Sequence, residues 1–234
     1  GDLHAMNDGT DHDAIDRDVE LILNTPGLYV VMGGDYIDND IKHLAATIAA
    51  HMPPGEQWRW LEEFLPRIAP KMVALVGGNH DAWTAAASGF DPLRGISARI
   101  GVPYDSDEVE IVAQVGGQRY TLCVRHKYHS NSRRNPENSV RAMWEFGDSD
   151  FDAGVVCDKH TATVAPFMRH KRERWLLRPG SYKVIDKYAR QHGFHGVAPV
   201  TPVLVVRPDR RDMHAFASLD WACEYLRTIN GGKK

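Results

Sequence analysis

The sequence predicts an α/β fold in which parallel strands carry polar side chains to one edge of a sheet. Two short apolar runs, at residues 30–32 and 72–76, each stop at a pair of glycines followed by a polar cluster. Such runs are typical of buried strands in a parallel sheet. After residue 100 the apolar residues alternate with a period of two, which indicates a second set of strands that contains a hairpin.

Length and composition narrow the class of protein. A chain of 234 residues suits one α/β domain over residues 1–234. With 43% hydrophobic and 25% charged residues it is neither disordered nor membrane-spanning. The formal net charge of -3 does not favour nucleic acid, which remains an unsupported alternative partner. We interpret Cys123, Cys157 and Cys223 as buried thiols of a reducing compartment, so we expect a cytoplasmic protein.

Helical spacing of apolar residues predicts the helices of the first half. They are expected at residues 11–24, 41–51, 56–68 and 92–100. Acidic residues crowd the first turn of the first helix, Pro53-Pro54-Gly55 separates the second from the third, and Pro70 closes the third. The chain opens on the loop Gly1-Asp2-Leu3-His4 with no apolar run before it. We therefore expect the strand that should precede Asp2 to be missing, as in an N-terminally truncated domain.

A hairpin dominates the second half, because two alternating runs, at 109–115 and 118–125, flank Gly116-Gly117. A loop at 127–135 and a helix from Pro136 to Trp144 are expected next, with proline in its first turn. The remaining predicted elements are strands at 153–157, 161–168 and 174–177, a charged turn at 170–173, a helix near 184–191, strands near 200–206 and 213–216, and a helix at 219–226.

Polar residues recur at the predicted ends of five strands. They are Asp2 and His4, Asp35 and Asp38, Asn79, His80 and Asp81, His126, and Asp158 with His160. Taken singly, a strand-end Asp is usually a helix cap and a lone His an ordinary satisfied residue. Their recurrence indicates a metal centre, because carboxylate, imidazole and amide together suit divalent metals such as Mn, Fe, Co, Ni or Zn.

These residues resemble the motifs of the calcineurin-like metallophosphoesterases. That family carries Asp-x-His, Gly-Asp-x-x-Asp, Gly-Asn-His-Asp or Glu, a lone His, and Gly-His-x-His. Here the motifs stand as Asp2-Leu3-His4, Gly34-Asp35-Tyr36-Ile37-Asp38, Gly78-Asn79-His80-Asp81, His126 and Cys157-Asp158-Lys159-His160. The turn Arg178-Pro179-Gly180-Ser181 is similar to the Asn-Pro-Gly-Ser turn of some bacterial phosphodiesterases of this group. The resemblance implies two facing mixed β-sheets flanked by helices, an αββα sandwich, here without its first strand.

The resemblance also implies a centre of two divalent metal ions. Metal one would be held by Asp2, His4, Asp35 and His160, and metal two by Asp35, Asn79, His126 and the Asp158 position. Asp35 would bridge the pair, with a metal-bridging hydroxide attacking the phosphate ester in line. His80 would then face the leaving oxygen as general acid or charge stabiliser, with Asp81 orienting its imidazole. Manganese is the favoured metal, with Fe, Zn, Ni, Co or Mg as alternatives.

Two of these positions leave alternatives open. Asp158 stands where the family has His, and a carboxylate ligand would shift the preference toward Mn or Mg. The alternative is that Asp158 turns away and water completes the shell. Asp38 either supports the ligands or caps the helix near residue 41.

The segment 125–134 is also open to two interpretations. Its cations, Arg125, Lys127, Arg133 and Arg134, either contact the phosphate of the substrate or belong to a solvated loop. His129, in the same segment, is the alternative to His126 as the lone His. His126 is preferred because it lies nearer the end of the predicted strand.

The sequence thus predicts a metal-dependent phosphoric ester hydrolase acting on phosphomonoesters or phosphodiesters. One alternative is a nuclease, which the acidic charge balance weakens. The other is a degenerate metal-binding scaffold or interaction module without turnover, against which the retained His80 and Asp81 argue. The natural substrate and the oligomeric state do not follow from the sequence, because loops around a shared centre set specificity.

Overall fold

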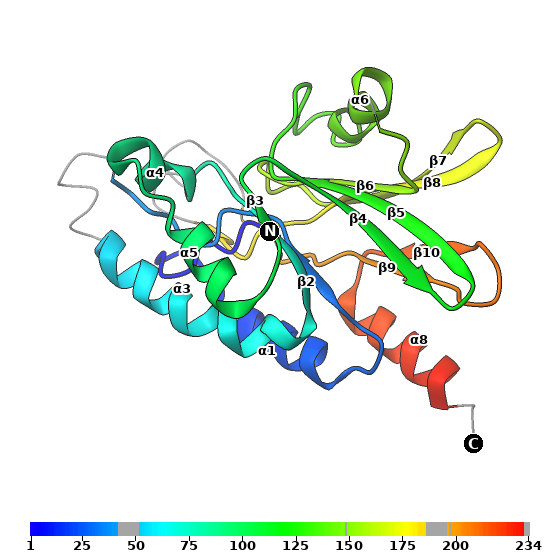
Figure 1. The fold of residues 1–234 in the computed structure, drawn as a ribbon, viewed down its shortest axis with the longest axis horizontal. Helices are drawn as coiled ribbons and strands as arrows, with labels where there is room; N and C mark the ends of the chain where they lie inside the picture. Colours follow the sequence, from blue (N-terminus) through cyan, green and yellow to red (C-terminus); the bar gives the residue numbers. More distant parts are fainter. Residues whose placement is uncertain (42–51, 148, 186–195, 197, 232–234) are drawn as a thin grey trace.

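The computed structural model describes residues 1–41, 52–147, 149–185, 196 and 198–231. Its elements form four layers, helix, sheet, sheet and helix, which confirms the predicted αββα sandwich (Figure 1). The first helical layer contains α1 (His12–Asn24), α3 (Pro54–Ile68), α5 (Pro92–Ile100) and α8 (Leu219–Gly231). On the opposite side of the molecule, α6 (Asn138–Phe146) forms the outer layer (Figure 1).

The first sheet is parallel and has the order β1-β2-β3. Its strands are β1 (Val30–Met32), β2 (Met72–Val76) and β3 (Tyr104–Asp105). Apolar faces of the helices pack on it, with Ile15 of α1 and Leu61 of α3 in the same core cluster as Met32 and Leu75. The two glycine-terminated strands are therefore where the sequence predicts them, and their carboxyl ends lie at one edge.

The second sheet has five strands in the order β4-β5-β6-β8-β7. Its strands are β4 (Glu108–Val115), β5 (Gln118–Arg125), β6 (Ala153–Val156), β7 (Thr163–Arg169) and β8 (Arg172–Arg178). The outer pairs are antiparallel hairpins, and β6 pairs in parallel with β5 and β8, so the sheet is mixed. The two sheets face each other through Ala74 and Val76 of β2 and Val109 and Val124 of the hairpin β4–β5.

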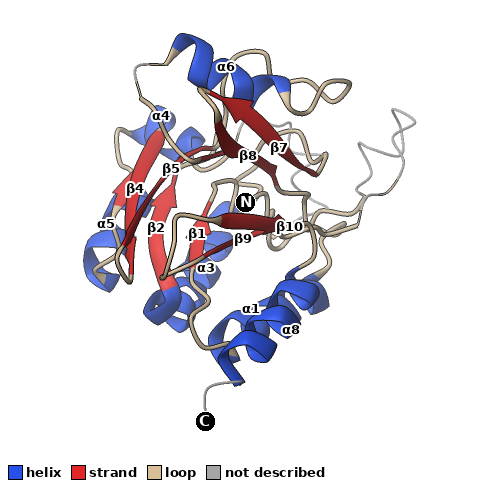
Figure 2. Ribbon diagram, turned by 90° about the vertical axis from the view of Figure 1, so that its right-hand side faces the viewer, coloured by secondary structure: helices blue, strands red, loops and turns tan. Residues whose placement is uncertain are grey.

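A separate antiparallel ribbon consists of β9 (Val203–Val206) and β10 (Met213–Phe216). Met213 and Ala215 pack with Trp175 and Leu177 of β8, so the ribbon packs against the five-stranded sheet. Figure 2 shows it crossing in front of β1 and β2, with α1 and α8 beneath it.

Several predicted boundaries need correction. The helix expected from Pro136 begins at Asn138, and the strand expected from residue 200 begins at Val203. The turn expected at 170–173 contains only His170 and Lys171, both with positive φ, so β8 already begins at Arg172. Longer than predicted, α8 extends from 219 to 231 instead of ending at 226.

Other predictions for the elements have different outcomes. The helix predicted at 41–51 lies outside the described residues except for its first residue, which is in a turn. In the helix predicted near 184–191, residues 184 and 185 are not helical and the others are not described. A short helix, α4 (Ala82–Ser88), and the two-residue β3 were not expected, because neither is long enough to establish a period. That residues 1–234 form a single domain remains a prediction.

The cysteines and the helices test two expectations from composition. Cys123, Cys157 and Cys223 are all buried free thiols, as predicted. Within the described part of the chain, no helix combines the length and apolar character that crossing a membrane requires.

Candidate metal centre

The first motif is held in place by the loop that follows β1. The backbone amides of Asp2, His4 and Ala5 donate to the carbonyls of Gly34, Asp35 and Tyr36, at 2.8, 3.0 and 2.9 Å. From the other side, the hydroxyl of Ser181 and the amide of Tyr182 both donate to the Asp2 carbonyl. The turn at 178–181 therefore anchors the first motif beside the second.

The loops after β1 and β2 touch, and glycine permits the contact. A Cβ on Gly78 would lie 2.1 Å from the backbone nitrogen of Asp35 and 2.2 Å from its Oδ1. Five sequence-predicted ligands also have left-handed backbone conformations, with φ between 46° and 75°: Asp2, His4, Asp35, Asp158 and His160. Non-glycine residues rarely adopt this region, and such strain clusters at functional sites. The backbone is thus bent to bring these side chains together.

Asp35 lies at the middle of the cluster and is almost fully buried. Its Oδ2 lies 3.2 Å from Nε2 of His126, 3.8 Å from Nε2 of His4 and 4.0 Å from Nε2 of His80. Burial alone would raise the pKa of Asp35, but His126, then His4 and His80, outweigh it and hold the pKa well below its usual range. The site therefore stabilises the ionised form of Asp35, chiefly through His126.

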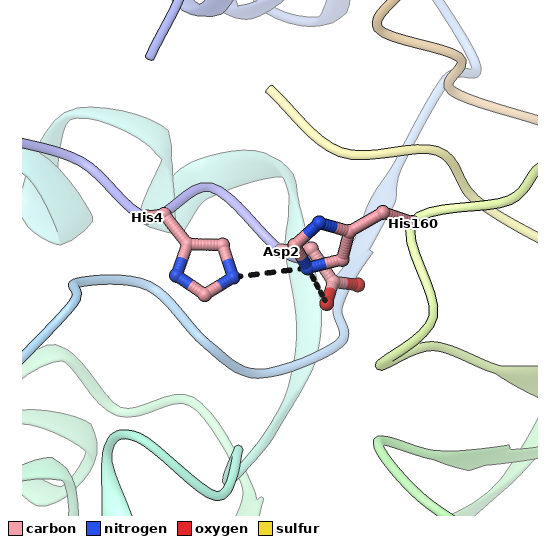
Figure 3. Close-up of side chains that lie close together, drawn as sticks. All are labelled: Asp2, His4 and His160. Carbon is pink, nitrogen blue, oxygen red and sulfur yellow. Dashed lines mark hydrogen bonds and ion pairs between the residues drawn. The ribbon is translucent and has the colours of Figure 1, made fainter. Parts of the chain in front are cut away.

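Asp2, His4 and His160 form one group of donor atoms (Figure 3). Nε2 of His160 lies 3.2 Å from Nε2 of His4 and 3.4 Å from Oδ1 of Asp2. That Oδ1 is buried and accepts no hydrogen bond, although a buried anionic oxygen left unpaired costs considerable free energy. A buried carboxylate oxygen that accepts no hydrogen bond and lies close to imidazole nitrogens fits a bound cation.

His126, Asn79 and Asp158 form a second group, in which His126 also contacts Asp35. The inward-facing amide atom of Asn79 lies 3.3 Å from Nε2 of His126 and 3.2 Å from Oδ1 of Asp158. When Nε2 of His126 carries no proton, an inward nitrogen would donate hydrogen bonds to both, whereas an inward oxygen would make three acceptors converge. The first orientation satisfies the amide without a metal, and the second is the one that a cation requires.

Backbone and carboxylate partners fix the tautomers of two histidines. Nδ1 of His126 lies 2.8 Å from the carbonyl of Gly33, which can only accept, so Nδ1 carries the proton. Nδ1 of His4 lies 2.6 Å from Oδ1 of Asp38. Burial lowers the pKa of His4 and outweighs Asp38, so the neutral ring leaves Nε2 free to bind a metal.

A metal ion that binds His126 competes with a proton for Nε2 of its ring. Burial would lower its pKa, but the carboxylate of Asp35 outweighs burial and raises the pKa well above the usual value. Binding of a cation at Nε2 therefore has to displace that proton.

Asp38 supports the cluster. Its carboxylate accepts from His4, from the side chain of Asn7 and from Lys183, whose Nζ lies 3.1 Å from Oδ1. Burial alone would raise the pKa of Asp38, but His4 and then Lys183 hold it well below its usual range. Of the two roles considered, this geometry favours the supporting one. The helix that Asp38 was alternatively expected to cap lies outside the described residues.

The prediction that Asp81 orients the imidazole of His80 is wrong. Nδ1 of His80 lies 2.7 Å from the carbonyl of Asp38, whereas the carboxylate of Asp81 accepts from the amides of Asp35, Tyr36 and Gly78. Asp81 has helical backbone angles, and consecutive residues of a helix do not face each other. Asp81 thus joins the two loops, and burial with the nearby charge of Asp35 raises its pKa to about 7.

The cations of the basic segment 125–134 have different surroundings. Arg125 forms an ion pair with Glu108 and lies over the ring of Tyr128, so its charge is already engaged. Lys127 and Arg134 are exposed, as expected of a solvated loop. His129 is exposed and lies against Tyr128 and Phe146, whereas His126 is buried beside Asp35. This placement favours His126 over His129 as the lone His.

Sequence reasoning missed three residues of this region. Lys183 contacts Asp38, Asn131 contacts Asp158, and the buried Arg178 contacts Asn131. Only Arg178 had a signal in the sequence, because it begins the turn Arg178-Pro179-Gly180-Ser181. Nothing in that turn indicated that Asn131 would be its partner.

Comparisons with known proteins give two results. A family model described as "Calcineurin-like phosphoesterase" matches residues 1–197. Among solved structures, one similar chain is the Thermus thermophilus sulfate thiohydrolase SoxB in complex with glycerol, at 13% sequence identity and a TM-score of 0.42. The match covers 97% of this chain and 46% of that one, so the chain spans about half of that structure's length. The comparison with curated proteins found no match.

Proposed function

The chain belongs to the calcineurin-like phosphoesterases, which hydrolyse phosphate esters with the help of metal ions, and on this premise we propose that it is a dinuclear phosphoesterase. We assign Asp2, His4 and His160 to one metal ion, and Asn79, His126 and Asp158 to the other. Asp35 lies between the two groups and serves both. The proposed substrate class is a phosphomonoester or phosphodiester.

One observation carries the proposal. Oδ2 of Asp35 lies near Nε2 of His126 and near Nε2 of His4, and the buried Oδ1 of Asp2 has no hydrogen-bond partner. A scaffold stabilised only by internal contacts would be expected to pair such an oxygen, because leaving it unpaired costs about 1–3 kcal/mol or more. The hard carboxylates and borderline imidazoles suit Mn, with Fe, Zn, Ni, Co or Mg as alternatives.

Two metal ions bound here would neutralise the phosphate oxygens and acidify a water molecule. The residues of the chain contribute orientation and proton transfer. Asp38 fixes the ring of His4, and the Gly33 carbonyl fixes that of His126, so each presents Nε2 to the cluster. Asp81 holds the loops after β1 and β2 together through three backbone amides.

His80 is the proposed general acid. Its Nδ1 donates to the Asp38 carbonyl, which leaves Nε2 on the side of Asp35 to carry a second proton. Its side chain is 20% exposed, more than those of His4 and His126 at 2% and 3%. Access to solvent suits a group that gives a proton to a leaving oxygen and then recovers one.

The test is reconstitution of chelator-treated protein with Mn, followed by measurement of bound Mn per chain and of hydrolysis of nitrophenyl phosphate and bis(nitrophenyl) phosphate. We expect two Mn per chain and turnover of at least one ester. His126→Ala should lose the second Mn, and the matched variant His129→Ala, changed at an exposed histidine three residues on, should keep it.

Two results would contradict the proposal. Fewer than two Mn per chain in the parent protein would exclude the dinuclear assignment. Two bound Mn without turnover of either ester would favour the non-catalytic scaffold.

A further inference from the structure

A chain of hydrogen bonds behind the second group of donor atoms begins at Arg178. This guanidinium is fully buried at the end of β8. Its Nη1 donates to the carbonyls of Ser132 and Pro136, at 3.0 and 3.1 Å, and its Nη2 donates to Oδ1 of Asn131. Arg178 thus ties the loop between β5 and α6 to the five-stranded sheet.

Asn131 links Arg178 to Asp158 by hydrogen bonds to both. A guanidinium only donates, so the amide atom of Asn131 that faces Arg178 must be the oxygen, and its orientation is fixed. The nitrogen, Nδ2, then donates to the carbonyl of Cys157 at 3.1 Å and to Oδ2 of Asp158 at 3.0 Å. Lys159 reaches the same Oδ2 at 2.7 Å.

The two carboxylate oxygens of Asp158 therefore have different surroundings. Oδ2 is held from behind by Asn131 and Lys159, while Oδ1 points toward the amide of Asn79 at 3.2 Å. Lys159 constrains the carboxylate of Asp158 only weakly, because the lysine side chain is 32% exposed and ion pairs in contact with solvent contribute little. Asn131 is positioned by a buried cation and is the rigid partner.

We propose that Asn131, fixed by Arg178, is a positioning residue that holds the carboxylate of Asp158 as a ligand of the second metal ion. The inference rests on the proposed function, because it presumes that Asp158 faces a metal. Asp158 stands where the family's motif has a histidine, so a carboxylate in this place needs an orienting partner of its own. Arg178 also supplies positive charge near Asp158, whose carboxylate is the strongest of the charges that oppose the lowering of the pKa of Arg178 by burial.

The test is a Mn titration into chelator-treated Asn131→Ala, followed by calorimetry, with thermal unfolding as the check on folding. We expect the first Mn to bind as in the parent and the second to bind about 10- to 100-fold more weakly, as is typical when the partner of a ligand is removed. The control is Asn135→Ala, an exposed asparagine of the same loop, which should bind both ions normally.

A second background separates the possible causes. In Asp158→His, where the ligand no longer depends on a carboxylate, adding Asn131→Ala should cause no further loss of the second Mn. An equal loss in both backgrounds would mean that Asn131 acts on the metal by another route, and would overturn the inference. Loss of both ions together with a lower melting temperature would also overturn it, because Asn131 would then be a structural residue.

Failure of the proposed function gives a different pattern. If Asp158→Ala leaves the affinity for the second Mn unchanged, the assignment of Asp158 as a ligand is wrong, and the inference falls with it. If Asp158→Ala weakens the second ion but Asn131→Ala does not, the metal assignment stands and only the positioning role is wrong.

Discussion

Two clusters of buried charge, one around Asp152 and one around Asp35, are built in opposite ways. Oδ1 of Asp152 accepts from Arg174 and Arg211, each at 2.7 Å, and Oδ2 accepts from Arg211 at 2.8 Å and from the amide of Thr121 at 2.9 Å. Around Asp35, by contrast, the neighbours of the carboxylates are imidazoles, and the buried Oδ1 of Asp2 has no hydrogen-bond partner.

The backbone conformations of the two clusters also differ. Asp150, Asp152, Arg174 and Arg211 all have negative φ, whereas Asp2, His4, Asp35, Asp158 and His160 are left-handed. Charges that the chain pairs by itself need no partner from outside, and removing one of them destabilises the fold. Acceptors brought together by a strained backbone need a cation from outside the chain. The comparison separates a structural ion cluster from a candidate metal centre without reference to family.

The largest effect is expected at Asp35, which serves both proposed metals. Asp35→Asn removes the charge but keeps an oxygen for the amide of His80, so the loop contact survives. Hydrolysis should fall by about 10³-fold or more, because the clamp formed by two metals is lost. Elemental analysis should show less metal at both sites. Full metal content with a near-normal rate would contradict the bridging role.

Asp152→Asn should do the reverse, lowering stability and sparing the metal. The buried Arg174 then keeps only its ion pair with the exposed Asp150, so the free energy of unfolding should fall by about 1–3 kcal/mol. Urea denaturation with a parallel Mn titration measures both quantities. A weaker Mn affinity at unchanged stability would contradict the division between the clusters.

The same variant has a pH signature. Burial alone would raise the pKa of Asp152, but Arg211 outweighs it, and the net shift is downward. A lowered folded-state pKa gives stability that is present above the unfolded value of about 3.9 and lost as the pH falls through the folded value. The difference in stability between the parent and Asp152→Asn should therefore shrink as the pH falls below about 4. A constant difference would mean that packing, and not charge, is responsible.

A smaller and more selective effect is expected at His80. His80→Ala should slow hydrolysis of an alkyl phosphate ester by about 10²-fold, but that of a nitrophenyl ester much less, because the nitrophenolate leaves without a proton. Initial rates on the two esters measure this. Equal losses on both would remove the general-acid role and leave His80 as a structural neighbour of Asp35.

The parts of the site that the sequence predicted are those encoded locally. The runs before Gly33-Gly34 and Gly77-Gly78 are short and apolar, and Gly116-Gly117 marks the hairpin between two strand-like runs, so strands and their polar ends could be located. Contacts between distant segments could not. The carboxylate of Asp38 reaches His4, 34 residues away, and Arg178 reaches Asn131, 47 residues away. Such pairs are set by how the sheets pack, which no spacing records.

Asp81 shows the limit of reasoning from a motif. The resemblance implies that it orients the imidazole of His80, but the start of α4 turns the two apart, and Asp81 accepts from the amides of Asp35, Tyr36 and Gly78. A local backbone direction, absent from the composition of the motif, decided its partner.

The most direct test of the contrast between the clusters is the melting temperature of the parent, Asp35→Asn and Asp152→Asn proteins as a function of added Mn. A ligand at 100 times its dissociation constant stabilises the native state by about 2.7 kcal/mol, which corresponds to a rise of very roughly 5–10 °C for a chain of this size. We predict a saturable rise for the parent, the same rise from a lower start for Asp152→Asn, and little or none for Asp35→Asn. An equal rise in all three, or none in the parent, would contradict a metal centre at Asp35.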